Sequence, residues 1–218
     1  MNIISFVTQK GGTGKSTLAL SLAVAAEQRG ERVCVLDLDP QGTSAAWYDT
    51  RSAETPAVVG ADKVGTLSDT LRKLEKAGYS LVVIDTAGVD SHATRGAMQS
   101  ADICLIPVRP SEADVKATTA TISALMAMKK PFAFVLNQTP PARQARLTAA
   151  VGMRLSTAAT VVPVAIASRM DHQYAYALGQ GVTEYDPEGK AAAEVVELWD
   201  WCRKKIGKTA HEQTKRRA

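Results

Sequence analysis

A glycine-rich segment stands between the first apolar run of the chain and a long stretch with helical character. Residues 9–17 read QKGGTGKST and closely follow the run Ile3–Val7. Glycine reaches backbone conformations that other residues avoid, so the N–H groups of such a turn can converge on phosphate oxygens at the start of a helix. The pattern therefore predicts a strand, a phosphate-binding turn and a helix in succession, which is one unit of an α/β fold.

Apolar runs alternate with longer helical segments along the rest of the chain. Nearly continuous aliphatic runs favour strands buried on both faces, as in a parallel sheet. The predicted strands are Ile3–Val7, Arg32–Leu38, Leu81–Asp85, Ile103–Val108, Phe132–Leu136 and Val161–Ile166. The predicted helices are Lys15–Arg29, Thr66–Lys76, His92–Gln99, Glu112–Met128, Arg143–Leu155, Met170–Leu178 and Lys190–Lys205. This order predicts a doubly wound α/β fold with a mainly parallel sheet and helices on both faces. Residues 51–65 are predicted to form a loop.

Composition and charge exclude some classes of protein. No apolar run approaches the roughly 18–20 residues of a membrane-spanning helix, and the three cysteines are too scattered for a disulfide framework, which favours the cytoplasm. The net charge of the 218 residues is +4, and residues 201–218 hold seven Lys or Arg against one acid. We expect one domain over residues 1–207 and a basic tail over 208–218. A solvated tail and an attraction to nucleic-acid phosphates or anionic lipid both agree with this composition.

The glycine-rich segment also suggests roles for its polar side chains. Lys15 should reach the β- and γ-phosphates of a nucleotide, and the Ser16 hydroxyl should bind Mg²⁺. The usual phosphate-loop pattern has glycine where this chain has Gln9, and a second lysine, Lys10, precedes the glycine pair. An extra cation at this place makes sense where a highly anionic group must be neutralised.

Carboxylates follow two of the predicted strands. In an open parallel sheet, ligands bind at the carboxyl ends of the strands, so Asp37, Asp39 and Asp85 should lie near the phosphate loop. We assign Asp39 to orient or deprotonate an attacking water, and Asp37 to the metal shell or to pairing with a lysine. Asp85 ends an aliphatic strand typical of a Walker B motif and should hold Mg²⁺ directly or through water.

These motifs together resemble the ParA/MinD family of deviant-Walker-A ATPases. The resemblance rests on residues 10–17, 37–42 and 83–87, with further matches at 106–111, Asp114 and 135–137, and it extends through 166–187. It implies a P-loop fold, slow Mg²⁺-dependent ATP hydrolysis, and a homodimer formed on ATP. In that dimer Lys10 reaches the nucleotide of the partner. The catalytic residues implied are Asp39, Lys10 and Lys15, and Asn137 contacts adenine. The nucleotide contacts implied are Lys10, Gly11, Gly12, Thr13, Gly14, Lys15, Ser16, Thr17 and Asn137.

Among the branches of that family, the chain is most similar to compact partition ATPases. Because the phosphate loop begins at residue 9, no preceding helix-turn-helix is expected. Such partition ATPases bind DNA without sequence preference as ATP dimers on the nucleoid, until a centromere-bound or adaptor protein stimulates hydrolysis and releases them. The candidate DNA-binding residues are Arg169, Lys190, Arg203, Lys204 and Lys205.

Three other functions agree with the same motifs. The same ATPase can position protein cargo, such as a chemotaxis cluster or a microcompartment, and the difference lies in the partner. A MinD-like membrane-cycling ATPase needs a C-terminal amphipathic helix. An apolar stripe that includes Val195, Trp199 and Ile206 has helical spacing, but we interpret it as packing on the sheet. A nucleotide-binding scaffold without turnover is the remaining alternative, and Lys15 and Asp39 argue against it.

Overall fold

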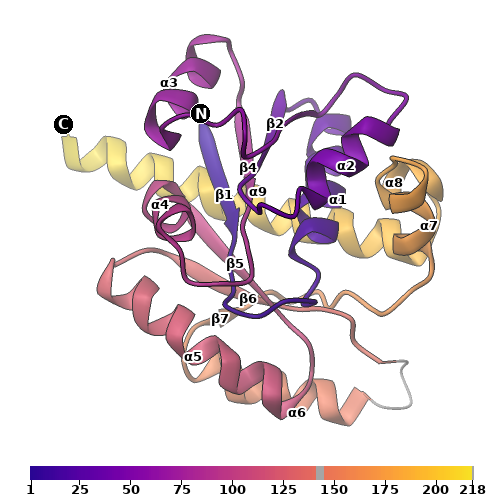
Figure 1. Cartoon of the computed structure of the whole chain (residues 1–218). Helices are drawn as coiled ribbons and strands as arrows, with labels where there is room; N and C mark the ends of the chain where they lie inside the picture. Colours follow the sequence, from indigo (N-terminus) through magenta and orange to yellow (C-terminus); the bar gives the residue numbers. More distant parts are fainter. Residues whose placement is uncertain (141–144, 218) are drawn as a thin grey trace.

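The computed structural model describes the backbone of residues 1–140 and 145–217 and the side chains of residues 1–140 and 146–207. Across these residues the strands form one parallel sheet in the order β3-β2-β4-β1-β5-β6-β7 (Figure 1). The strands are β1 (Asn2–Phe6), β2 (Val33–Asp37), β3 (Ala57–Val59), β4 (Leu81–Asp85), β5 (Ile103–Val108), β6 (Phe132–Leu136) and β7 (Thr160–Val161). The predicted α/β class with a parallel sheet is confirmed.

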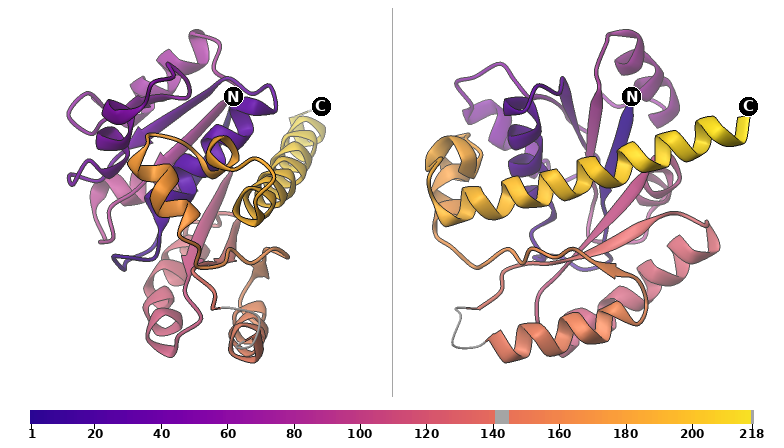
Figure 2. Two further views of the ribbon diagram at one scale, coloured as in Figure 1. Left: turned by 90° about the vertical axis from the view of Figure 1, so that its right-hand side faces the viewer. Right: turned by 180° about the vertical axis from the view of Figure 1, so that it is seen from behind.

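Helices cover both faces of this sheet. They are α1 (Lys15–Gln28), α2 (Thr43–Thr50), α3 (Leu67–Lys76), α4 (His92–Ser100), α5 (Glu112–Ala127), α6 (Ala145–Ser156), α7 (Asp171–Ala177), α8 (Val182–Tyr185) and α9 (Lys190–Arg217). Figure 2 shows α9 running along one face of the sheet, with α3 and α4 on the opposite side. None of the helices in the described part of the chain is long and apolar enough to cross a membrane.

The core divides along the sheet because successive strand residues point to opposite faces. Val33 and Val35 of β2 pack into the cluster that contains α1 and α9, whereas Cys34 and Leu36 pack toward α3 and α4. Strands β2, β4 and β5 are buried at every position, which explains why their sequences show no alternation.

The apolar stripe of α9 lies inside the protein. Val195, Leu198, Trp199 and Cys202 are fully buried in the cluster shared with α1, and Ile206 is nearly so. The interpretation of this stripe as core packing is therefore confirmed. Helix α9 also runs beyond the predicted end at Lys205, to Arg217. The predicted tail over 208–218 therefore includes the last part of α9. The side chains of residues 208–217, and the whole of residue 218, lie outside the described residues.

Four short elements differ from the prediction. The segment 51–65 was wrongly predicted to be all loop, because Ala57–Val59 pairs with β2 as an edge strand. Helices α2 and α8 were also missed. The strand predicted over Val161–Ile166 is only Thr160–Val161, because Pro163 has no N–H to donate to a ladder. For the helix predicted over 143–155, residues 143 and 144 lie outside the described residues.

Candidate functional site

Three loops meet at the carboxyl edge of the central strands. Asp37 at the end of β2 is directly opposite Asp85 at the end of β4, and Phe6 at the end of β1 is opposite Asp85 on the other side. The glycine-rich loop follows β1. The register of the sheet therefore brings the loop, Asp37 and Asp85 together, as the strand-end argument predicted.

The backbone of the glycine-rich loop takes conformations that need glycine. Gly12 and Gly14 have positive φ angles of 74° and 86°. A Cβ atom on Gly14 would lie 2.3 Å from Nδ2 of Asn137, and one on Gly88, after β4, would lie 2.9 Å from the nitrogen of Gly11. The loop is thus closely enclosed by the segments that follow β4 and β6.

This loop fits an anion such as a nucleotide phosphate. The first turn of α1 carries no acidic side chain, so the positive end of its dipole is not neutralised locally. The buried hydroxyl of Thr13 has no hydrogen-bond partner among the residues that the structure describes. A Cβ on Gly11 would meet nothing within 4 Å. The loop therefore has backbone space and an unused polar group at the start of a helix, where anions bind.

Lys15 is buried at the start of α1. Its Nζ lies 3.5 Å from the carbonyl oxygen of Lys10. Burial lowers the pKa of Lys15, while the charges of Asp85 and Asp39 raise it and only partly compensate. The ammonium group therefore lies in the field of both carboxylates at a cost in desolvation that a phosphate would offset.

Asp85 and Ser16 fit a hard cation such as Mg²⁺. One carboxylate oxygen of Asp85 accepts a hydrogen bond of 2.9 Å from Ser44, and the other is buried without a partner in the described part of the chain. A hydroxyl and a free carboxylate oxygen are ligands that Mg²⁺ accepts, together with phosphate and water. No group of three or more His, Cys, Asp or Glu residues within the described ranges could hold a metal ion alone.

Burial raises the pKa of Asp85 to about 6, with a smaller contribution from the charge of Asp37, while the hydroxyl groups of Ser16 and Ser44 and the charge of Lys15 lower it. The ordinary value is 3.8, so between these values the folded protein binds a proton that the unfolded chain releases. This carboxyl group therefore favours folding at acidic pH, and the contribution is lost as the pH rises through 6.

Asp85→Asn should therefore stabilise the protein free of nucleotide and Mg²⁺ at neutral pH. The amide oxygen can still accept from Ser44, and the cost of burying a charge disappears. We expect the free energy of unfolding in urea to increase by roughly 1–3 kcal/mol at pH 7.5, and by much less at pH 4.5. Asp49→Asn, on the exposed side of α2, is the control. An equal gain at both pH values would contradict the burial argument.

Asp37 stabilises the segment that carries Asp39. Its Oδ2 accepts hydrogen bonds from the N–H groups of Ser44 and Ala45, at 2.8 and 3.0 Å, and its Oδ1 accepts one from the N–H of Asp39. Asp37 thus caps the first turn of α2 from the preceding strand, because the N-cap residue, Gly42, has no side chain to do so. Helix α2 was not predicted from the sequence. Its predicted contact with a metal or a lysine stays a prediction.

Asp39 lies on the open turn between β2 and α2. It is only partly buried, and its Oδ1 accepts a hydrogen bond of 3.0 Å from the N–H of Gln41. Because the strand ends at Asp37, Asp39 belongs to the turn and is oriented independently of the strand. Its charge acts on Lys15, so the structure places it at the same site.

Lys10 forms an ion pair within the same chain. Its Nζ lies 2.5 Å from Oδ1 of the buried Asp114, which also accepts hydrogen bonds from Arg109 and Ser111. Burial by itself raises the pKa of Asp114, but the hydrogen bonds from Arg109, Lys10 and Ser111 outweigh it and hold that pKa below its usual range. The pairing of Asp114 with Lys10 was not predicted from the sequence. The only local signal was Ser111 followed by Asp114, the spacing of a helix cap.

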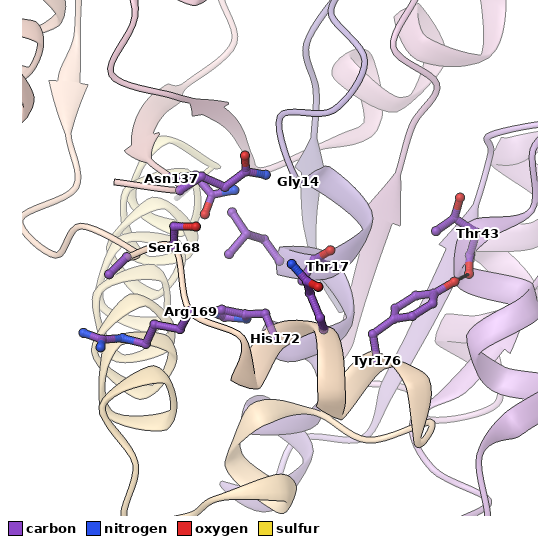
Figure 3. Close-up of a pocket in the computed structure, with 12 residues that line it drawn as sticks. Gly14, Thr17, Thr43, Asn137, Ser168, Arg169, His172 and Tyr176 are labelled. Atoms are coloured by element: carbon purple, nitrogen blue, oxygen red, sulfur yellow. Dashed lines mark hydrogen bonds between the residues drawn. The ribbon is translucent and has the colours of Figure 1, made fainter. Parts of the chain in front are cut away.

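A cavity of about 500 Å³ lies beside the glycine-rich loop (Figure 3). The residues around it are Gly14, Thr17, Leu18, Thr43, Asn137, Gln138, Ala167, Ser168, Arg169, His172, Gln173 and Tyr176. Thr17 and Asn137, both predicted nucleotide contacts, thus lie on one cavity. Nδ2 of Asn137 donates a 2.7 Å hydrogen bond to the carbonyl oxygen of Thr13, so it also holds the loop.

Helix α7, which confirms the helix predicted over Met170–Leu178, forms one side of this cavity. Its place beside the glycine-rich loop was not predicted. Both ring nitrogens of His172 are buried and have no partner within the described ranges. Burial lowers the pKa of His172, so the ring is neutral at pH 7. The hydroxyl of Tyr176 donates a 2.8 Å hydrogen bond to the carbonyl oxygen of Thr43.

The predicted DNA-binding residues fall into separate places. Arg169 lies on the cavity and forms an ion pair with Glu194, 2.6 Å between Nη2 and Oε1. Lys190 begins α9, and Arg203, Lys204 and Lys205 are exposed about 20 Å further along the helix axis. Lys205 lies over the ring of Trp201, 5.4 Å from its centroid. Only the last three form a cluster, and a role of any of the five in DNA binding stays a prediction.

Comparison with known proteins adds to this geometry. Residues 4–164 match the family described as the CobQ/CobB/MinD/ParA nucleotide binding domain. The chain is 31% identical over 197 residues to "Maintenance of carboxysome distribution protein A" of Halothiobacillus neapolitanus, covering 86% of this chain and 89% of that protein. It is 32% identical over 126 residues to the protein ParA of Rhizobium radiobacter, covering 57% of this chain and 54% of that protein.

A solved structure shows the same fold. The septum site-determining protein MinD of Pyrococcus horikoshii, solved with Mg-ADP, superposes with a TM-score of 0.74 at 21% identity and covers 95% of this chain and 98% of its own. The family match spans most of the sheet, the glycine-rich loop and the segments that carry Asp37, Asp39 and Asp85. The chain therefore belongs to the CobQ/CobB/MinD/ParA family of nucleotide-binding domains and has the P-loop fold of its MinD and ParA members.

Proposed function

We propose that this chain is an ATPase switch that dimerises on ATP, binds DNA without sequence preference as the ATP dimer, and is released when a partner protein stimulates hydrolysis. Relatives in its family include a chromosome-partitioning ATPase, Soj of Thermus thermophilus, and the cell division ATPase MinD of Pyrococcus furiosus. The observation that carries the proposal is the buried Lys15, which lies in a glycine-rich loop and in the field of Asp39 and Asp85. A cation (Lys15), a candidate base (Asp39) and a candidate metal ligand (Asp85) therefore lie together at the start of α1.

Each residue of the loop has a proposed part in binding ATP. The N–H groups of residues 11–17 hold the phosphates, and Lys15 neutralises the β- and γ-phosphates. Ser16 and Asp85 hold Mg²⁺, which supplies further charge neutralisation on the phosphates when bound. Thr17 and Asn137 contact the nucleoside in the adjoining cavity. Asp39 orients the attacking water and accepts its proton.

Lys10 is proposed to act on the nucleotide of a second subunit. For this it must leave Asp114, which keeps two other donors, Arg109 and Ser111, when Lys10 departs. The buried carboxylate is then still paired, so the exchange of Lys10 from Asp114 to a phosphate is energetically feasible. A cation supplied by a partner stabilises the charge of the transition state as an arginine finger does.

Mobility shifts with random-sequence duplex at several salt concentrations test the proposal. We expect wild type to retard the duplex with ATP and Mg²⁺ but not with ADP, with a dissociation constant of about 10⁻⁴–10⁻⁶ M that rises steeply with salt. The double variant Arg203→Glu/Lys204→Glu should bind about tenfold more weakly or worse. Lys73→Glu/Lys76→Glu, exposed on α3, makes the same change in net charge elsewhere and should have a smaller effect.

Lys10→Ala is the second arm of this experiment. It should abolish both the ATP-dependent retardation and the doubling of mass in light scattering. Equal DNA binding by the two double variants would exclude the α9 cluster as the DNA surface. An ATP dimer that persists in Lys10→Ala would contradict the role of Lys10 across the subunits.

The cargo is a separate question, for which one relative gives a second candidate. The similarity to a carboxysome distribution protein over 86% of the chain favours positioning of protein cargo on the nucleoid as an alternative to DNA partition. Both use the same ATP cycle and differ in the partner. A membrane-cycling role is less favoured, because the apolar stripe of α9 through Ile206 is buried in the core.

A further inference from the structure

Tyr176 connects the cavity beside the phosphate loop with the turn that carries Asp39. Its ring lies on the cavity, and its hydroxyl donates a 2.8 Å hydrogen bond to the carbonyl oxygen of Thr43 (Figure 3). Burial raises the pKa of Tyr176, and the charges of Asp37 and Asp85 raise it further. The hydroxyl therefore keeps its proton and remains a donor.

Thr43 belongs to one short hydrogen-bonded unit with Asp39. The N–H of Gly42 donates to the carbonyl oxygen of Asp39 at 2.9 Å, and the N–H of Gln41 donates to the Asp39 carboxylate at 3.0 Å. Asp37 binds the N–H groups of Asp39 and of the two residues after Thr43. Thr43 therefore lies in a segment whose hydrogen bonds on either side hold the backbone and the carboxylate of Asp39.

Helix α2 is held along its length by the segment that follows Tyr176. Trp47 donates to the carbonyl oxygen of Gln180, and Arg51 binds the carbonyl oxygen of Gly179 and the carboxylate of Glu184. Tyr176 makes the corresponding contact at the start of the helix, next to the catalytic turn. The segment 176–184 thus contacts α2 and its C-terminal end through Tyr176, Trp47 and Arg51, and of these contacts the one made by Tyr176 begins on the cavity.

We propose that Tyr176 is a positioning residue, which transmits occupancy of the nucleoside cavity to Asp39. A nucleoside in the cavity restricts the ring of Tyr176, and the hydroxyl then holds the Thr43 carbonyl and the turn of residues 39–43 in one arrangement. This inference rests on the proposed function, in which Asp39 orients the attacking water. Through this contact of Tyr176 with Thr43, ATP hydrolysis depends on binding of the nucleoside as well as of the phosphates.

Tyr176→Phe tests this, because it keeps the ring on the cavity and removes only the donor. Tyr174→Phe is the matched control, since Tyr174 is on the same helix, its side chain is exposed, and its hydroxyl makes no hydrogen bond among the residues described. We expect the affinity for ATP and the KM to change by less than about twofold in both variants. The kcat of Tyr176→Phe should fall roughly three- to tenfold, as expected for loss of one hydrogen bond, and that of Tyr174→Phe should not change.

Hydrogen exchange gives a second readout that does not need turnover. In wild type, ADP with Mg²⁺ should slow exchange in peptides covering residues 41–46 as well as 11–17. In Tyr176→Phe the protection of 11–17 should remain and that of 41–46 should be lost. If that variant fails to fold, absence of ADP protection over 41–46 in wild type overturns the inference by itself.

The results distinguish failure of this inference from failure of the proposed function on which it rests. If wild type binds no nucleotide in calorimetry, both fail. If wild type binds nucleotide but Tyr176→Phe matches Tyr174→Phe in kcat and in exchange over 41–46, Tyr176 is not a positioning residue and the proposed function stands. A rise in KM with kcat unchanged would assign Tyr176 to nucleotide binding alone and would also overturn the inference.

Discussion

Lys15→Ala is expected to lose most of its affinity for ATP. The Lys15 side chain is buried at the start of α1, directly after Gly14 of the loop. Removing one partner of a buried charge pair costs about 2–5 kcal/mol, which corresponds to roughly 30-fold or more in the dissociation constant. Isothermal calorimetry with ATP and Mg²⁺ measures this directly, and turnover should fall with it.

Unfolding does not account for this loss. Because burial lowers the pKa of Lys15, the ligand-free protein carries a cost at this residue that alanine removes. The melting temperature of Lys15→Ala without nucleotide should therefore equal or exceed that of wild type. Lys73→Ala, exposed on α3, is the control for loss of a lysine. Normal ATP affinity in Lys15→Ala would remove the assignment of the phosphate loop.

Asp39→Ala is expected to bind ATP and to dimerise but to hydrolyse ATP at least about 100-fold more slowly. A positioned general base contributes roughly 10²–10⁴ in rate, and Asp39 is on the open turn where a water molecule can reach it. Its carboxylate makes one backbone contact within the turn, so the fold should survive. Single-turnover assays with labelled ATP measure the rate, and calorimetry checks binding.

Asp49→Ala is the matched control for Asp39→Ala, since Asp49 is an exposed carboxylate on the adjoining helix α2. It should turn over ATP as wild type does. Wild-type turnover in Asp39→Ala would exclude Asp39 as the base. A wild type that binds ATP without any turnover, alone or with DNA, would instead support the scaffold without hydrolysis.

Much of the site could be predicted because it is encoded locally. The glycines at 11, 12 and 14 specify a turn at the start of a helix, and an aspartate at the end of a buried strand lies at the carboxyl edge of a parallel sheet by necessity. The continuous aliphatic runs likewise indicate strands buried on both faces. Short elements such as β3 and α2 were harder to predict from the sequence. They have few residues, and contacts with distant segments hold them in place.

The sequence by itself determined the parallel α/β fold, the glycine-rich loop at the start of α1 and the carboxylates beside it, since each depends on neighbouring residues and on the geometry of one strand or turn. Only the tertiary structure decided that Lys10 lies on Asp114, that Asp37 caps α2, and that Tyr176 of α7 reaches Thr43. The last of these joins residues 133 positions apart. Such pairs depend on how helices pack against the sheet, and no local pattern of residue types encodes that packing.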